Sequence, residues 1–171
     1  GANYVGFTVA TPGILDLSVL GNVSIDIYNQ DTLVSTLSGR SLISTSIPLL
    51  NGIGKKQIGA LVKDSFDEVR LKYANPIGSN VAQTILVYDF FMESFCSPGL
   101  GVLPDNMTCG QTTLFKKPDY PLYIDFNHTG NSGSLLEIGD INNPSFAIDD
   151  DTTNAASITA PASLGANGVG F

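Results

Sequence analysis

The densest group of side chains that could do chemistry is an acidic run near the end of the chain. Residues 149–151 are three consecutive aspartates, residues 152–154 read Thr-Thr-Asn, and Asp140, Asn142 and Asn143 lie close upstream. Ca²⁺ prefers oxygen ligands on a flexible loop. The run does not have the spacing of an EF-hand, with its central glycine and terminal glutamate. The run predicts either a Ca²⁺ site, with Ca²⁺ as the one candidate cofactor, or a solvated Asp/Asn turn before a strand.

Residues typical of a hydrolase do not come together in the sequence. Such an enzyme needs a nucleophile beside a base, or two carboxylates that face each other across a cleft. The only histidine, His128, lies in a Gly- and Asn-rich stretch without an evident partner. Asp67 and Glu68 are neighbours in an alternating segment, so their side chains point to opposite sides. We therefore expect no enzyme and no catalytic residues, with His128 on the surface.

Asp89 is the charged residue within an otherwise apolar run, residues 84–92. A buried carboxylate is costly unless it has a partner. We expect Asp89 to lie at a sheet edge or to pair with Arg40 or a lysine.

Cys96 and Cys109 are the two cysteines of the chain, and a segment containing Gly and Pro separates them. The chain has the composition of an extracellular protein, which favours a disulfide. Closing a loop of this size would contribute about 3 kcal/mol. Two free buried thiols are the alternative. The disulfide is favoured over it also because neither cysteine has a histidine or a second cysteine at metal-binding spacing.

The overall composition excludes some classes of partner. The 171 residues carry 8 Lys and Arg against 16 Asp and Glu, a net charge of −8. Nucleic-acid binding needs a basic surface, so no nucleic-acid partner is expected. No apolar run approaches the ~20 residues of a membrane-spanning helix, and the first residues do not read as a signal peptide. We expect a soluble segment that is either mature or excised.

Alternating apolar and polar residues predict the strands that must position these groups. Residues 23–28, 57–63 and 67–73 alternate, which is typical of strands with one solvated face. Residues 84–92 are apolar on both faces and predict a central strand, and residues 4–9 are similar but shorter.

After Cys96 the alternation weakens, and only residues 122–126 predict a further strand. Short strands separated by Gly, Pro and Asn are typical of all-β folds. We expect an antiparallel β-sandwich or jelly roll, with a loop-rich, disulfide-containing connecting segment.

The two ends of the chain repeat each other. Residues 1–7 read GANYVGF and residues 165–171 read GANGVGF, six identities in seven positions at a separation of 164 residues. Self-similarity at a fixed period is the signature of a tandem array. The chain would then be slightly more than one period of a longer protein; coincidence between two Gly-rich heptapeptides is the alternative.

Further motifs follow in a definite order. They are the heptapeptide, GILDLSVLGNVSIDIYNQ at 13–30, DSFDEVRLKY at 64–73, TILVYDFFM at 84–92 and IDDDTTNAASI at 148–158. Read as circularly shifted by one repeat, this order resembles the long repetitive surface proteins exported by Bacteroidetes-type bacteria, including gliding-associated and adhesin-like proteins. The chain departs from them at Asp150, where a small residue is usual, and at Ala155, where an aromatic is usual.

The change in composition after Cys96 and the repeated heptapeptide divide the chain into three parts. Residues 1–95 would form the main β-sandwich core, and residues 96–139 a connecting segment with Cys96 and Cys109. Residues 140–171 would form an Asp-rich segment that begins or completes the neighbouring repeat. That segment also resembles the Asp-rich loop of galactose-binding-like jelly rolls. By this likeness Asp149, Asp151 and Asn154 are the candidate Ca²⁺ ligands.

Two functions of different classes follow. The leading hypothesis is a non-catalytic structural repeat of an extracellular bacterial filament, stalk or adhesin, whose partners are neighbouring copies or repeats that share strands with it. The alternative is a Ca²⁺-dependent carbohydrate-binding module of a secreted protein that contacts surface glycans. The chain has no Trp, so Tyr88, Tyr120 and Tyr123 are the candidates for stacking against sugars. Both hypotheses place the protein outside the cell or at the cell surface.

Overall fold

The computed structural model describes residues 2–12, 21–42, 54–74, 83–95, 110–132, 140–160 and 168–170. Their order along the chain is β1 (Ala2–Ala10), β2 (Val23–Asn29), β3 (Thr32–Ser38), η1 (Gly39–Leu42), β4 (Lys56–Val62), β5 (Glu68–Ala74), β6 (Gln83–Phe95), β7 (Thr112–Phe115), β8 (Gly130–Ser132), β9 (Asp140–Asn142), η2 (Pro144–Ala147), β10 (Ala156–Ala160) and β11 (Gly168–Gly170). The η elements are single 3-10 turns. The predicted all-β character is confirmed.

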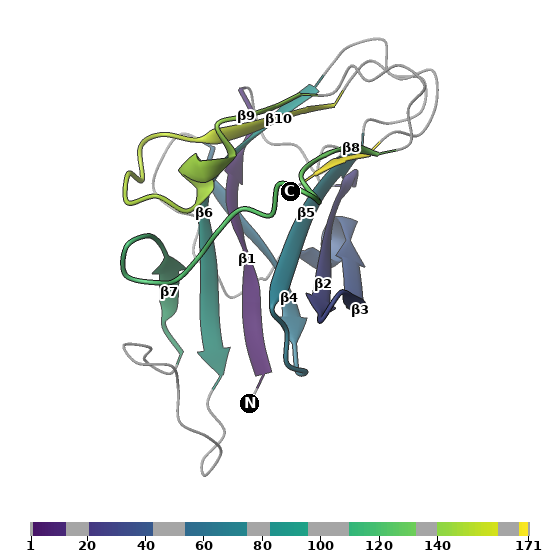
Figure 1. The fold of residues 1–171 in the computed structure, drawn as a ribbon, viewed down its shortest axis with the longest axis vertical. Helices are drawn as coiled ribbons and strands as arrows, with labels where there is room; N and C mark the ends of the chain where they lie inside the picture. Colours follow the sequence, from purple (N-terminus) through teal and green to yellow (C-terminus); the bar gives the residue numbers. More distant parts are fainter. Residues whose placement is uncertain are drawn as a thin grey trace.

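The strands form two antiparallel sheets (Figure 1). The first has the order β4-β1-β6-β10-β9, with β7 also paired to β6, and the second has the order β3-β2-β5-β11-β8. Each predicted strand before Cys96 is present, as β1, β2, β4, β5 and β6. Among the described residues, no helix is long and apolar enough to cross a membrane.

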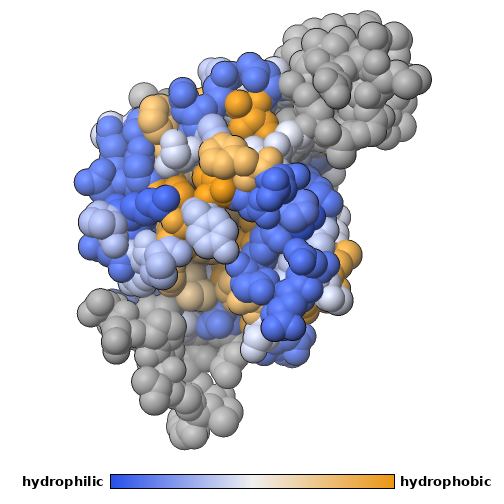
Figure 2. All heavy atoms as spheres, in the orientation of Figure 1, coloured by the Kyte–Doolittle hydropathy of each residue, from blue (hydrophilic) through white to orange (hydrophobic). Residues whose placement is uncertain are grey.

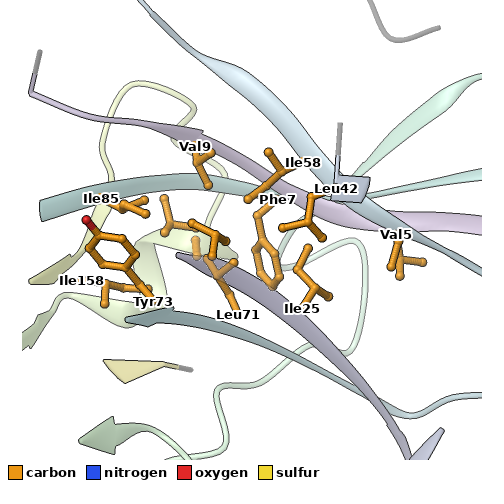
Figure 3. Packing of buried hydrophobic residues seen from close by; sticks show 14 of the residues in the cluster. Val5, Phe7, Val9, Ile25, Leu42, Ile58, Leu71, Tyr73, Ile85 and Ile158 are labelled. Carbon is orange, nitrogen blue, oxygen red and sulfur yellow. The ribbon is translucent and has the colours of Figure 1, made fainter. Parts of the chain in front are cut away.

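One hydrophobic core lies between the two sheets (Figure 3). The first sheet contributes Val5, Val9 and Ile58, and the second contributes Ile25 and Leu71. These side chains alternate along their strands with residues of the opposite face, as a period of two requires. All five are fully buried, so packing between the sheets holds the fold together.

The longest strand, β6, changes the face of its side chains halfway along. Thr8 pairs with Asp89 but Val9 pairs with Val87, so Tyr88 is an extra residue in β6. Such a bulge bends the strand and re-aims the side chains beyond it. As a result Val87 faces the core on one side of the bulge, and Phe90 on the other side is packed against the same core. β6 is central, as predicted, because it pairs with β1 along one edge and with β10 and β7 along the other.

Residues 116–129, which we call the crossing segment, run from β7 in the first sheet to β8 in the second (Figure 1). The prediction of a strand at residues 122–126 is wrong, because this stretch pairs with neither sheet. The partly buried Leu122 and Ile124 alternate there with the exposed Pro121 and Tyr123. The alternation therefore reflects a segment laid over the space between the sheets.

Strands from all three expected parts of the chain enter the same two sheets. Within this chain, β10 of the Asp-rich segment pairs with β6, and β11 pairs with β5. The described residues of the two heptapeptide copies therefore lie in different sheets: β1 lies between β4 and β6, and β11 lies between β5 and β8. Cys96 and Cys109, predicted to form a disulfide, lie outside the described residues.

Candidate ligand-binding pocket

A pocket of about 450 Å³ lies beneath the crossing segment. This is within the usual range of small-molecule sites, about 300–1,000 Å³. Its wall is largely apolar and includes Phe7, Phe66, Phe90, Met92, Phe115 and Ile124. Figure 2 shows apolar residues at the surface in the middle of this face of the molecule, with hydrophilic residues on both sides.

Aromatic rings from three strands build one side of the pocket. Phe7 of β1 and Phe90 of β6 are paired across the first sheet, and their ring centres are 5.4 Å apart. Phe115 of β7 meets Phe90 edge to face at 5.8 Å. The bulge at Tyr88 makes this possible, because it aims Phe90 at the space between the sheets. Ring pairs of this kind hold their geometry without a polar partner.

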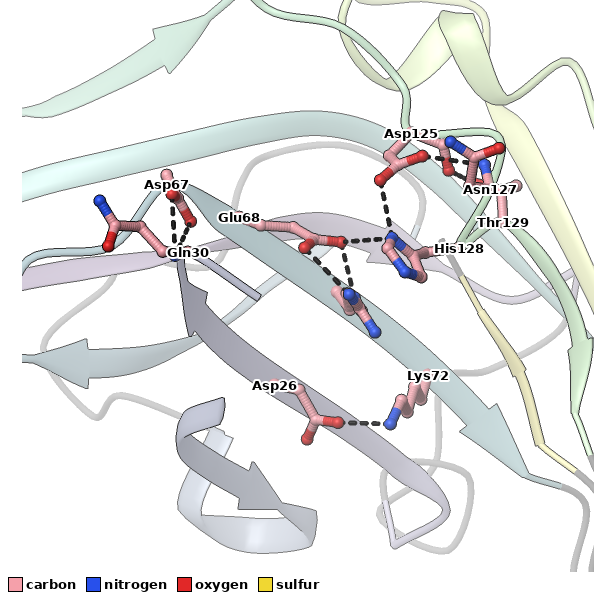
Figure 4. A network of polar contacts seen from close by, with 10 residues as sticks. Asp26, Gln30, Asp67, Glu68, Lys72, Asp125, Asn127, His128 and Thr129 are labelled. Carbon is pink, nitrogen blue, oxygen red and sulfur yellow. Dashed lines mark hydrogen bonds and ion pairs between the residues drawn. The ribbon is translucent and has the colours of Figure 1, made fainter. Parts of the chain in front are cut away.

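The rim of the pocket is polar and joins the crossing segment to β5 (Figure 4). His128 Nδ1 lies 2.7 Å from an Asp125 carboxylate oxygen and 3.7 Å from Glu68 Oε1. The Arg70 guanidinium donates to both oxygens of Glu68, at 2.6 and 3.0 Å, and packs over the ring of Tyr28 at 3.8 Å. A bidentate pair of this type fixes orientation as well as charge.

Two groups of this network have shifted pKa values. The backbone N–H of Asn127 and then His128 donate to Asp125 and lower the pKa of its carboxyl group. The hydrogen bond to Glu68 raises the pKa of Arg70. Both charged forms are stabilised by direct hydrogen bonds. The network joins the crossing segment to β5 through the 3.7 Å approach of His128 Nδ1 to Glu68 Oε1.

Glu68, Asp125 and His128 also place three possible metal-ligand atoms within 4.8 Å of one another. However, both oxygens of Glu68 already accept hydrogen bonds from Arg70. A metal ion at this point would lie close to the positive guanidinium, and it would displace the contact between His128 and Asp125. The arrangement fits a hydrogen-bonded ion network better than a metal centre.

The residues expected to bind Ca²⁺ lie on the loop between η2 and β10 and bond mainly to one another. Asp149 accepts one hydrogen bond from the backbone of Asp151, at 3.1 Å, and one from the side chain of Asn154, at 2.9 Å. The amide oxygen of Asn154 is buried and has no hydrogen-bond partner within the described ranges. The predicted set is thus brought together, with its oxygens already partly engaged.

Neighbouring donors take up further oxygens of this loop. The hydroxyl and backbone N–H of Thr153 donate to one oxygen of Asp151, at 2.6 and 2.8 Å. These bonds lower the pKa of Asp151. The ammonium group of Lys55 donates to the carbonyl oxygen of Thr152 at 3.0 Å. A cation bound here would have to share these oxygens with donors of the chain itself.

Of the three tyrosines expected to stack against sugars, only Tyr123 lines the pocket. Its side chain is 81% exposed. Tyr120 packs against Phe115, with ring centres 4.2 Å apart, and the Lys55 ammonium lies 3.5 Å from the ring centre of Tyr88. The three rings therefore have different immediate surroundings.

Asp89, the charged residue of the apolar strand, pairs with a lysine, which was one of the predicted alternatives. Lys116 Nζ lies 2.7 Å from Asp89 Oδ1, and both side chains are largely buried. This ion pair ties the start of the crossing segment to β6.

Sequence reasoning missed the pocket itself. His128 is exposed, as predicted, but the sequence did not indicate that it lines a pocket together with Asp67 and Glu68. The one available signal was the run from Tyr120 to Phe126, which is rich in aromatic residues although it has no strand partner.

Comparison with known proteins adds no relative to this description: no family model, curated protein or solved structure matches the chain.

Proposed function

We propose that this chain is a non-catalytic β-sandwich of jelly-roll type, and that it serves as a ligand-binding module of a secreted or surface-exposed repeat protein. The observation that carries the proposal is the pocket beneath the crossing segment. It combines aromatic walls with a polar rim, which is the usual make-up of a small-molecule site. The repeated heptapeptide and the acidic composition support the extracellular setting.

The contacts around the pocket favour binding over catalysis. Among the described residues, His128 contacts two carboxylates. The nearby Thr129 hydroxyl donates to the backbone oxygen of Asp125, at 2.7 Å. A hydroxyl nucleophile would instead have to donate to its base. These groups position the crossing segment.

A neutral apolar dye, N-phenyl-1-naphthylamine, tests the proposal through its fluorescence. We expect saturable binding to the full chain with a stoichiometry of one. Leu122 lines the pocket from the crossing segment, so Leu122→Trp should fill the space and weaken dye binding at least about tenfold. Leu61→Trp is the matched control, because Leu61 is 48% exposed and does not line the pocket.

Circular dichroism and thermal unfolding would establish that both variants remain folded. The proposal is overturned if the dye does not saturate, or if a folded Leu122→Trp variant binds it as well as the unchanged chain does.

The purely structural repeat is the second candidate, and the position of β11 favours it. Gly168–Gly170 of this heptapeptide copy pair with β5 on one side and β8 on the other. An equivalent strand from a neighbouring repeat could complete the sheet in the same way. Electron microscopy together with sedimentation of the full chain tests this. Fibres or concentration-dependent oligomers support strand sharing, whereas a monomer of 18.0 kDa at all concentrations argues against it.

A further inference from the structure

The polar rim of the pocket carries charge of one sign. Four carboxylates line it, those of Asp31, Asp67, Glu68 and Asp125, together with His128 and without any Lys or Arg. Arg70 does not line the pocket but is bonded to Glu68. The charged residues that line the pocket are therefore mainly acidic, in a chain whose net charge is already −8.

Two of these carboxylates have no cation beside them in the described structure. Glu68 is paired with Arg70 and Asp125 with His128. Asp67 accepts hydrogen bonds from the backbone N–H of Gln30, at 3.2 and 3.0 Å. Neither Asp67 nor Asp31 forms an ion pair with another described residue. Both are exposed. Their charges remain available to a ligand.

The wall of the pocket offers the complementary surface. Phe66 and Val69 are close to Asp67 in the sequence and line the pocket with it, as do the paired rings of Phe7 and Phe90. Apolar groups gain free energy by leaving water for such a wall. Aromatic faces also attract cations.

We propose that the pocket binds a small amphiphile with an apolar body and a single ammonium head, with the head held between Asp31 and Asp67. This inference rests on the proposed binding function and adds the charge of the ligand. An anionic amphiphile of the same length is disfavoured, because its head would be repelled by the carboxylates of Asp31 and Asp67.

A series of eight-carbon ligands separates the contribution of the apolar body to binding from that of the polar head. The ligands are octylamine, octanol, octanoate and octyl glucoside, each titrated calorimetrically into the full chain at pH 7. We expect octylamine to bind best and octanoate worst, with a difference of about tenfold or more at low salt. The difference should shrink as the ionic strength is raised, because the carboxylates are exposed. Octanol should be insensitive to salt.

Substitution of the two free carboxylates tests the position of the head. In the double variant Asp31→Asn and Asp67→Asn, octylamine should bind no better than octanol, while octanol binding is unchanged. Asparagine tolerates the positive φ of 60° at Asp31. Asp64→Asn is the matched control, because Asp64 is exposed but does not line the pocket; it should leave the octylamine preference intact.

The outcomes distinguish the two proposals. If octanoate binds as tightly as octylamine, the inference about charge is overturned while the binding function stands. If octyl glucoside binds more tightly than octylamine, a carbohydrate head replaces the ammonium head and the inference is again overturned. If no member binds and the dye does not bind either, the proposed function itself fails.

Discussion

Gly6 of β1 lies directly opposite Gly59 of β4, and the two backbones approach so closely that a Cβ atom on Gly6 would lie 1.9 Å from the carbonyl oxygen of Ile58. The ring of Tyr4 packs against Gly59, since a Cβ atom on Gly59 would lie 2.9 Å from that ring. Tyr4 also donates to the carbonyl oxygen of Leu42 at 2.9 Å. The absence of side chains at both glycines thus allows an aromatic ring to lie across the β1–β4 pair.

Gly6→Ala should lower the free energy of unfolding by about 3 kcal/mol or more, because the obstacle is backbone and cannot rotate away. Gly110→Ala is the control. Gly110 also requires a special conformation, with φ of +72°, but a Cβ atom there would meet nothing within 4 Å. Its cost should be about 1 kcal/mol. Urea unfolding of both variants measures the difference; equal costs would contradict the close approach of β1 and β4.

Asp89 and Lys116 form a buried ion pair, and removing only one of the two charges should lower the free energy of unfolding. Lys116→Met leaves Asp89 buried without a cation, and we expect a loss of about 3–5 kcal/mol. The double variant Asp89→Leu and Lys116→Met should recover most of this loss, because two apolar side chains can pack where two charges were. A thermodynamic cycle of urea unfolding measures the coupling, and additive effects would show that the two side chains do not interact.

The lowered pKa of Asp125 makes its hydrogen bonds with Asn127 and His128 inside the crossing segment sensitive to acid. Its pKa is below the ordinary 3.8, so the folded state binds this proton less readily than the unfolded state. The stabilisation is therefore present above pH 3.8 and is lost as pH falls through the folded pKa. Carboxyl carbon NMR titration should show His128→Ala moving the Asp125 midpoint back toward 3.8.

Asp151 provides a matched control for that titration. Its pKa is also lowered, but by Thr153. Thr153→Val should raise the Asp151 midpoint and leave Asp125 unchanged, and His128→Ala should do the reverse. If both midpoints move with either substitution, the shifts have a common electrostatic origin and the assigned hydrogen bonds do not cause them.

The raised pKa of Tyr73 should lower the free energy of unfolding at alkaline pH. Burial raises the pKa of its hydroxyl group from 10.0 to about 12, and that hydroxyl donates to the Gln83 side chain at 2.7 Å. Between these two pH values the unfolded chain loses the proton while the folded chain keeps it, so the free energy of unfolding falls as pH rises. Tyr73→Phe should show a shallower fall over pH 10–12. An identical pH dependence in both proteins would contradict the assignment.

The loop between η2 and β10 is expected to bind Ca²⁺ weakly, with a Kd of about 1 mM or more. The reason is that Lys55 and Thr153 already donate to its oxygens. Removing the ammonium group in Lys55→Met should tighten Ca²⁺ binding, and Asp149→Asn should weaken it. Calorimetric titration with calcium chloride measures both. Absence of binding by Lys55→Met would leave the loop as a solvated turn.

The sequence by itself determined the main strands of the fold. Alternation fixes which face of a strand is apolar, and this period requires no knowledge of neighbouring chain segments. Residues 23–28 and 67–73, for example, align closely with β2 and β5. The sequence also indicated that Asp89 needs a partner, because the cost of a buried charge is a local property. It left the choice between Arg40, a lysine and a sheet edge open.

Only the tertiary structure decided how distant segments meet. Alternation at residues 122–126 is the same for a paired strand and for a segment laid across two sheets, so the sequence pattern could not separate them. The rim is formed where the crossing segment brings Asp125 and His128 to Glu68 at the start of β5. That encounter depends on the course of the chain through both sheets. Residue types and their spacing along the sequence do not reveal which distant residues meet. The pocket could therefore be recognised only in the tertiary structure.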